Sequence, residues 1–253
     1  MPGGKTRGLN QLLRYFPAEP SMLVSPFLGG GSLELALAAR GWHIHGYDAF
    51  EPLVDFWQEA LEDPVVLAEA VERYLPLDRD TFRRLQRTRL ESRCARAAAY
   101  FVINRSSFSG STMSGGMSPS HPRFDSNAID RLRRFRAPNL TVELADFRES
   151  IAAHPKTLLY CDPPYPDARS LYGVNGDKHD GFDHQALCDI LRSRDKWLLS
   201  YSDCPLVRWW YNDFTIIPLS WSYGMSIKRG RELLILSDDV AEDFRGRRGK
   251  ELP

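Results

Sequence analysis

The sequence predicts an α/β fold in which a mostly parallel sheet is interrupted by a mainly helical insertion. Residues 21–50 read as a strand, a glycine turn, a helix and a second strand, which is the opening βαβ unit of an open parallel sheet. More strand-like runs come after residue 139. Between these parts, residues 51–138 carry apolar residues at helical spacing and then a long loop. We therefore expect a catalytic domain of residues 1–50 and 139–253 around an inserted subdomain of residues 51–138.

The first elements have recognisable boundaries. "SMLVS" is the first strand, "PFLGGGS" the turn and "LELALAARG" the helix, with Gly41 as its stop, and "WHIHGYD" is a strand that ends at Asp48. Helical spacing then runs from about residue 52 to 103, with breaks at Pro64 and Pro76. "NRSSFSGSTMSGGMSPSHPRF" is rich in Ser and Gly and has little periodicity. A loop of that length in a compact domain is usually functional or disordered.

The second half alternates strands and helices. In order, we expect a short helix in "AIDRLRRFRAP", a strand in "LTVELADF" ending at Asp146, a strand in "LLYC", a loop up to Gly181, a helix in "FDHQALCDILRSR" and strands in "KWLLSYSD", "FTIIPLSW" and "RGRELLILS". The tail "FRGRRGKELP" is expected to be a disordered terminus, with a basic arm on DNA as the alternative.

Composition narrows the class of protein. The chain has 253 residues, 43% of them hydrophobic, which is enough for a large core. It has no apolar run long enough to span a membrane and no secretion signal, so we expect a soluble cytoplasmic protein. Its four cysteines form no CxxC pair and its six histidines form no ligand set. These patterns speak against a metal site and against a disulfide framework.

The charge is unevenly distributed. The formal net charge is zero, but residues 79–136 hold thirteen arginines, no lysines and four acids, a net charge of +9. A basic block in an otherwise acidic chain is the pattern expected for phosphate contact with a nucleic acid. A solvated helical face is the alternative.

Several predicted strands end in residues that carry chemistry, and in open parallel sheets ligands bind beyond those ends. The turn at residues 26–31 lets a ligand approach the backbone closely through its three glycines, although it matches neither the Walker A pattern nor GxGxxG, because position 34 is Glu. Asp48 ends the next strand, where an acid can hold both ribose hydroxyls. The alternative for Asp48 is a helix N-cap. Turn and acid together favour a cofactor that contains adenosine.

"YCDPPYP" places a carboxylate directly after an apolar strand. Pro163 and Pro164 hold the backbone so that the Asp162 side chain and the Pro163 carbonyl can accept the two hydrogens of one exocyclic amine. Tyr165 offers a flat face for a heteroaromatic ring. The alternative is a rigid turn with a capping carboxylate, which the glycine turn and the acid upstream disfavour.

In this order, the motifs resemble those of the Dam-like DNA adenine-N6 methyltransferases, the D12 class, over nearly the whole chain. "PGGKTRGLNQLL" resembles the family's lysine motif, "SPFLGGGSLELAL" its glycine motif and "GYDAFEPLVDFW" its ribose motif. "YFVINRSSFSG" resembles part of the target-recognition region, "ELADF" the adenine-pocket motif and "YCDPPYP" the catalytic motif. The resemblance implies a Rossmann-like catalytic domain and S-adenosylmethionine as methyl donor. It also implies double-stranded DNA as partner, with no metal, and we expect a monomer or a weak dimer.

The resemblance also implies roles for individual residues. The catalytic residues would be Asp162, Pro163, Pro164 and Tyr165, and the cofactor would be held by Lys5, Phe27, Gly29, Gly31, Asp48, Asp146, Phe147 and Asp162. DNA would be contacted by Asn104, Arg105 and Arg123. Asp146 and Phe147 could instead be an N-cap and a core aromatic, and the Asn104–Arg105 pair could brace its loop.

Other functions remain open at this point. The substrate amine could belong to RNA adenine or to another planar group such as a protein glutamine amide. A cytosine-N4 enzyme would more often have Ser at position 162. The last alternative is a catalytically silent DNA-binding module, which would have no need of Asp162 or Tyr165.

Overall fold

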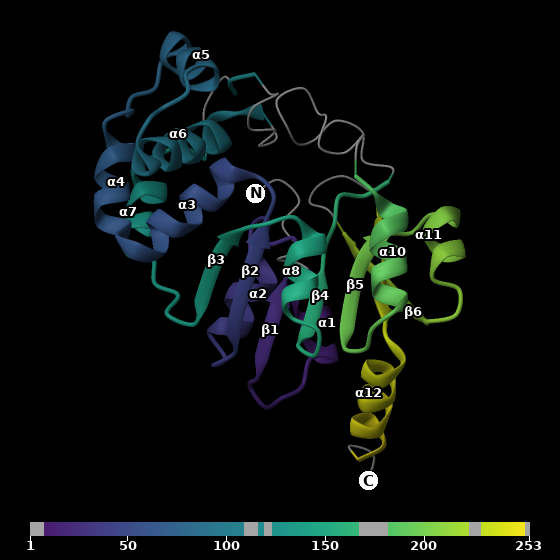
Figure 1. The fold of residues 1–253 in the computed structure, drawn as a ribbon. Coiled ribbons are helices and arrows are strands. Elements are labelled where there is room, and N and C mark those ends of the chain that lie inside the picture. Colours follow the sequence, from purple (N-terminus) through teal and green to yellow (C-terminus); the bar gives the residue numbers. More distant parts are fainter. Residues whose placement is uncertain (1–7, 109–115, 119–122, 167–181, 223–228, 251–253) are drawn as a thin grey trace.

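A seven-stranded, mostly parallel sheet forms the centre of the molecule (Figure 1). The computed structural model describes residues 8–108, 116–118, 123–166, 182–222 and 229–250, with backbone alone for 220–222, 229–231 and 248–250. The strand order is β3-β2-β1-β4-β5-β7-β6. The first five strands are parallel, and β7 and β6 run antiparallel to their neighbours. The predicted α/β class and mostly parallel sheet are confirmed.

The strands are β1 (Met22–Ser25), β2 (His43–Asp48), β3 (Leu140–Leu144), β4 (Leu158–Cys161), β5 (Trp197–Ser202), β6 (Thr215–Ser222) and β7 (Arg229–Leu236). The helices are α1 (Leu9–Leu12), η2 (Leu13–Tyr15), α2 (Ser32–Ala38), α3 (Glu51–Glu62), α4 (Pro64–Glu72), α5 (Arg79–Arg87), α6 (Arg93–Ser106), α7 (Ser126–Arg133), α8 (Phe147–Ala153), α10 (His184–Arg192), α11 (Pro205–Trp210) and α12 (Asp238–Lys250).

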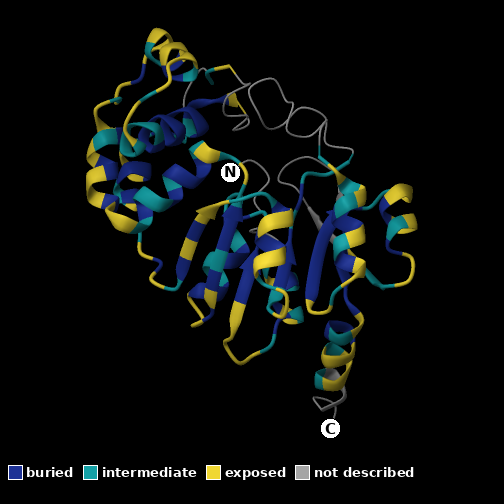
Figure 2. Ribbon diagram, viewed as in Figure 1, coloured by how far each residue is buried: buried dark blue, intermediate teal, exposed yellow. Residues whose placement is uncertain are grey.

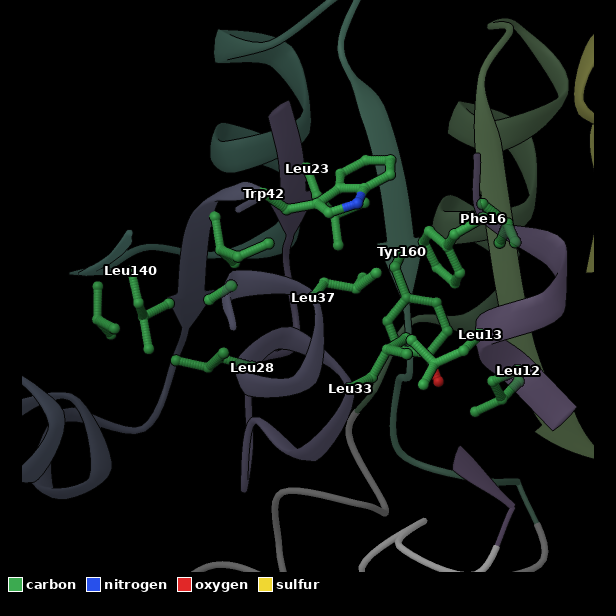
Figure 3. Packing of buried hydrophobic residues seen from close by; sticks show 14 of the residues in the cluster. Leu12, Leu13, Phe16, Leu23, Leu28, Leu33, Leu37, Trp42, Leu140 and Tyr160 are labelled. Atoms are coloured by element: carbon green, nitrogen blue, oxygen red, sulfur yellow. The ribbon is translucent and has the colours of Figure 1, made fainter. Parts of the chain in front are cut away.

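Both faces of the sheet are buried, as expected where helices cover parallel strands (Figure 2). Successive residues of a strand point to opposite faces. Leu23 of β1 therefore packs in the cluster under α1 and α2, together with Trp42 and Tyr160 (Figure 3), while Val24 packs in the cluster under α8 and α10. Each central strand reads as a continuous apolar run for this reason.

Helices α3 to α7 gather beside one end of the sheet around a core of their own (Figure 1). Helix α3 belongs to both cores, because Trp57 packs in the cluster of the sheet and Ala60 in that of the helices. Arg96 of α6 ties the two helices together through Nε, which lies 2.6 Å from Asp55 Oδ2. The carboxylate of Asp55 is buried, so this ion pair fixes α6 against α3.

The predictions from sequence placed one strand end two residues too late and did not include three short helical elements. The strand predicted to end at Asp146 ends at Leu144, because Asp146 is the N-cap of α8, with its side chain accepting from Arg148 N in a capping box with Glu149. The missed elements are helices α8 and α11 and the α1–η2 pair, none of which is longer than seven residues. Such short helices have almost no periodicity to detect.

The expectation of a disordered C-terminal tail is wrong for residues 244–250, which belong to α12. The ring of Phe244 lies 4.6 Å from that of Tyr15, and Arg247 donates to the carbonyl oxygens of Tyr15 and Phe16. These contacts with the N-terminal helices supply the burial that the tail's own sequence does not suggest. Helix α12 lies away from the helical insertion, at the far end of the sheet (Figure 1).

Candidate active site

The glycine turn links β1 to α2 at the carboxyl edge of the sheet. Gly29 and Gly31 adopt positive φ values of 48° and 60°, which L side chains rarely adopt. A Cβ on Gly31 would lie 3.1 Å from the Trp57 ring, whereas a Cβ on Gly29 would meet nothing within 4 Å. Gly29 therefore presents bare backbone to open space, as a cradle for a bound group requires.

Asp48 fixes the turn from the neighbouring strand. Its Oδ2 accepts from Gly29 N at 3.0 Å and its Oδ1 accepts from Phe50 N at 2.9 Å. The N-cap position of α3 is Phe50, without a side-chain cap, so the alternative role of Asp48 as N-cap is wrong. The carboxylate thus sits at the carboxyl end of β2, directly beside the glycine turn.

The Asp-Pro-Pro-Tyr segment follows β4 without a break. Asp162 is half-buried, and its Oδ1 accepts a hydrogen bond from the Tyr165 hydroxyl at 3.2 Å. The Tyr165 ring lies 5.9 Å from the buried ring of Tyr201, whose hydroxyl is 2.5 Å from His184 Nδ1. The carboxylate and the ring predicted to act on one substrate thus lie together, supported from β5 and α10.

An aromatic group lies next to the turn. The Phe27 and Phe147 rings are 5.7 Å apart, and both contact Phe182. Phe147 is buried, and Asp146 caps α8, so the structural roles named as alternatives for these two residues are present. Since neither role blocks contact with a ligand at this edge, the adenine-bracketing role stays a prediction.

The three residues predicted to contact DNA have different surroundings. Asn104 is only 6% exposed. Arg123 donates to the backbone oxygens of Ser107 and Asn104, at 2.8 and 3.3 Å, and so braces the end of α6. Arg105 is half-buried with its guanidinium over the Phe101 ring.

The guanidinium of Arg105 lies among other cations. Burial, and then the positive charges of Arg131 and Arg123, lower the pKa of Arg105. Arg105 has no carboxylate within ion-pair distance among the residues that the structure describes. A group of like charges of this kind attracts an anion.

A cavity of about 270 Å³ is lined by both the glycine turn and the helices of the insertion. Its wall contains Gly29 and Gly30 of the turn and Asn104, Arg105 and Arg131 of the insertion, together with several aromatic residues. Asp48 and Asp162 do not line it. The described part of the chain thus brings the Asn104–Arg105 pair to the same cavity as the glycine turn, although the two lie more than seventy residues apart in the sequence.

Two residues of this region escaped the sequence analysis. Trp57 donates from Nε1 to Gly29 O at 3.0 Å, and Arg131 shares the cavity wall with Arg105. Both fall in segments already singled out, the ribose-type motif and the basic block, but nothing in their spacing marks them. Lys5 lies outside the described residues.

Two kinds of feature are absent from the described residues. They contain no group of three or more His, Cys, Asp or Glu side chains that could hold a metal ion. In the same residues, no helix is long and apolar enough to cross a membrane.

Comparison with known proteins agrees with the geometry. The family model of the D12 class N6 adenine-specific DNA methyltransferases matches residues 2–225. The chain is also 25% identical, over 247 aligned residues, to the type II methyltransferase M1.LlaDCHI of Lactococcus lactis subsp. cremoris, covering 85% of this chain and 84% of that protein. The family match includes the lysine motif, the glycine turn, Asp48 and the Asp-Pro-Pro-Tyr segment. The chain therefore belongs to the D12 class of N6 adenine-specific DNA methyltransferases.

Proposed function

We propose that the chain methylates the N6 amine of an adenine flipped out of double-stranded DNA, with S-adenosylmethionine as donor. The observation that carries this proposal is the pairing of Asp162 with Tyr165 directly after β4, at the sheet edge that also carries the glycine turn. Family membership supports the reaction on adenine. Base flipping follows because the amine of a paired adenine is out of reach, and it costs about a few kcal/mol.

The residues fit the proposed donor. Gly29 leaves room beside the backbone, Asp48 is held where a ribose would lie, and Phe27 and Phe147 offer aromatic surface nearby. When bound, S-adenosylmethionine supplies a methyl group on a positively charged sulfur, which is already an activated leaving group. The protein's part is then to position the amine and to stabilise the charge that develops on it.

Asp162 would accept a hydrogen from the adenine amine, with the Pro163 carbonyl accepting the second. These bonds would favour an amine whose lone pair is free to take the methyl group. The proton that the nitrogen then loses would pass to water, and S-adenosylhomocysteine would be the other product. Tyr165 would stack on the base, since its ring is half-buried and tied to Asp162 through the hydroxyl.

Residues 51–138 are proposed to hold the DNA, with residues 1–50 and 139–253 as the catalytic domain. Arg105 is the best candidate for a phosphate contact, because its charge is half-buried beside Arg131. Asn104 and Arg123 would act by holding the end of α6, on which Arg105 lies.

Arg105→Ala is expected to lower DNA affinity about equally for all sequences and to reduce the salt dependence of binding by about one unit of slope. The measurement is fluorescence anisotropy with duplexes over a range of salt concentrations. Arg40→Ala is the matched control, since Arg40 is exposed at the end of α2, near the amino end of β2. Loss of affinity for one sequence alone would show that Arg105 reads a base instead.

Asp48→Ala is expected to lower S-adenosylmethionine affinity by about tenfold or more, because it removes a ribose acceptor and leaves the N–H groups of Gly29 and Phe50 without their bonds. Calorimetric titration measures the loss. Asp48→Asn, which keeps one acceptor oxygen, should fall between alanine and the unaltered protein. Equal affinity in all three proteins would remove Asp48 from the cofactor site.

The proposed function is tested by mass spectrometry of digested DNA from cells that express the chain. A rise in N6-methyladenine over cells with an empty vector is the expected result. Sequencing of the modified positions then identifies the target. Unchanged DNA together with intact S-adenosylmethionine binding would point to RNA or a protein amide as substrate, and absence of cofactor binding would point to a DNA-binding module.

A further inference from the structure

The cavity that the glycine turn shares with the insertion has an apolar wall and a charged wall. Apolar side chains make up most of its lining, among them the rings of Phe56, Trp57 and Phe135. Arg105 of α6 and Arg131 of α7 are the charged residues that line it, and no acidic residue of the described chain does. A volume of about 270 Å³ lies near the lower end of the range for small-molecule sites. The cavity therefore suits one small group that has an apolar part and an anionic part.

The two cavity arginines lack a counter-charge. Neither guanidinium group of Arg105 and Arg131 takes part in a hydrogen bond or an ion pair with another residue that the structure describes. By contrast, Arg133, two residues after Arg131 on the same helix, bonds to Asp130 and Glu72 at 2.8 Å each. The insertion thus neutralises an arginine that points away from the cavity and leaves the two at its wall with their charges unmet.

Arg105 is in an unfavourable position for a charge. It is half-buried, and its guanidinium lies 5.4 Å from the centroid of the Phe101 ring. Burial, and then the charges of Arg131 and Arg123, lower the pKa of Arg105. Asp125 acts in the opposite direction from beyond ion-pair distance, and its carboxylate caps α7. An anion in the cavity would offset both the burial of this charge and its repulsion by the neighbouring cations.

We propose that this cavity binds one nucleotide unit, with the phosphate at Arg105 and Arg131 and the base against the aromatic wall. Guanidinium groups bind phosphate oxygens in a bidentate manner, and bases stack on aromatic side chains. The site is distinct from the place proposed for the target adenine, because Asp162 and Tyr165 do not line the cavity. The inference does not depend on which amine the protein methylates.

The competing explanation is that the cavity belongs to the cofactor site and holds an anionic group of the cofactor. It shares Gly29 and Gly30 with the glycine turn, although Asp48, Phe27 and Phe147 do not line it. The two explanations differ in what S-adenosylhomocysteine does. If it fills a separate site, a nucleotide still enters the cavity when S-adenosylhomocysteine is present in excess.

The test is a nuclear magnetic resonance titration of the full chain with thymidine 5′-monophosphate, with and without excess S-adenosylhomocysteine. Thymine has no exocyclic amine for Asp162 to bind. The indole N–H signal of Trp57, assigned through its loss in Trp57→Phe, reports on the cavity wall, and that of Trp209, 67% exposed on α11, is the control. We expect the Trp57 signal alone to shift. The nucleotide should bind about tenfold or more tightly than thymidine or inorganic phosphate, under both conditions.

Three variants locate the phosphate. Arg105→Ala is expected to lower nucleotide affinity by about tenfold or more. Arg131→Ala should lower it by about three- to tenfold, and it covers the case in which Arg105→Ala does not fold, because Arg131 is exposed. Arg134→Ala is the matched control, with an expected change below about twofold. Arg134 follows α7 with its side chain 80% exposed and carries the same charge, but it does not line the cavity.

Three results would overturn the inference. Inorganic phosphate that binds as tightly as the nucleotide would mean that the aromatic wall contributes nothing. Loss of nucleotide binding in excess S-adenosylhomocysteine would assign the cavity to the cofactor. Equal losses in Arg131→Ala and Arg134→Ala would show only a general attraction between charges.

A competing DNA duplex then distinguishes the two sources of the nucleotide. Displacement of thymidine 5′-monophosphate by the duplex would identify a nucleotide of the DNA strand as the occupant, and continued binding would identify a free nucleotide. Nucleotide binding is measured without methyl transfer. A chain that binds the nucleotide as expected but leaves DNA unmethylated would therefore refute the proposed function and support this inference.

Discussion

Asp162→Ala is expected to lower the rate of methyl transfer by at least about a hundredfold while DNA affinity stays within about threefold. The carboxylate is half-buried next to Tyr165 at the end of β4, where it can accept from the adenine amine as charge develops. It does not lie in the arginine-lined cavity of the insertion, so duplex binding should not depend on it. Single-turnover transfer of a labelled methyl group and anisotropy with the same duplex measure the two quantities.

Two further variants separate the parts of this site. Asp162→Asn keeps the shape and loses the charge, and we expect it to be nearly as inactive as the alanine variant. Tyr165→Phe keeps the ring and removes only the hydroxyl bond to Asp162, so it should lose less than about tenfold, whereas Tyr165→Ala also removes stacking worth about 1–3 kcal/mol. Turnover close to that of the unaltered protein in Asp162→Ala would refute the proposed mechanism.

The elements that sequence predicted well are those with strong local patterns. Leu23 and Val24 of β1 and the last three residues of the strand before Asp162 are buried, so both strands read as short apolar runs. The glycine turn is recognisable because Gly29 and Gly31 adopt a backbone conformation that other residues avoid. The resemblance to the family depends on the order of the motifs along the chain, because no single motif is specific enough to indicate it.

The parts that sequence missed depend on contacts between distant residues. Helix α12 is held by contacts with Tyr15 and Phe16, more than 220 residues earlier, which the composition of the tail does not reveal. Arg123 donates to the backbone oxygens of Asn104 and Ser107, partners that nothing in the sequence marks, and its contact with DNA stays a prediction. The sequence shows where arginines are concentrated, but the groups to which each guanidinium donates are known only once the chain is folded.

Trp57→Ala is expected to lower the free energy of unfolding by about 3–5 kcal/mol, the usual cost of removing a buried tryptophan side chain. Trp57 is 5% exposed, donates to Gly29 O, and packs beneath Gly31 and against Phe135. It therefore joins the glycine turn to the helices of the insertion. Urea unfolding followed by circular dichroism measures the loss.

Trp209→Ala is the matched control, because Trp209 on α11 is 67% exposed and its removal should change the free energy of unfolding by less than about 0.5 kcal/mol. Trp57→Phe removes the N–H donor and keeps most of the apolar contact. We expect it to cost about 1–2 kcal/mol in stability and also to weaken S-adenosylmethionine binding, because the Gly29 carbonyl is then no longer held. Equal stabilities of Trp57→Ala and Trp209→Ala would show that Trp57 does not tie the glycine turn to the insertion, whereas the expected difference would support that role.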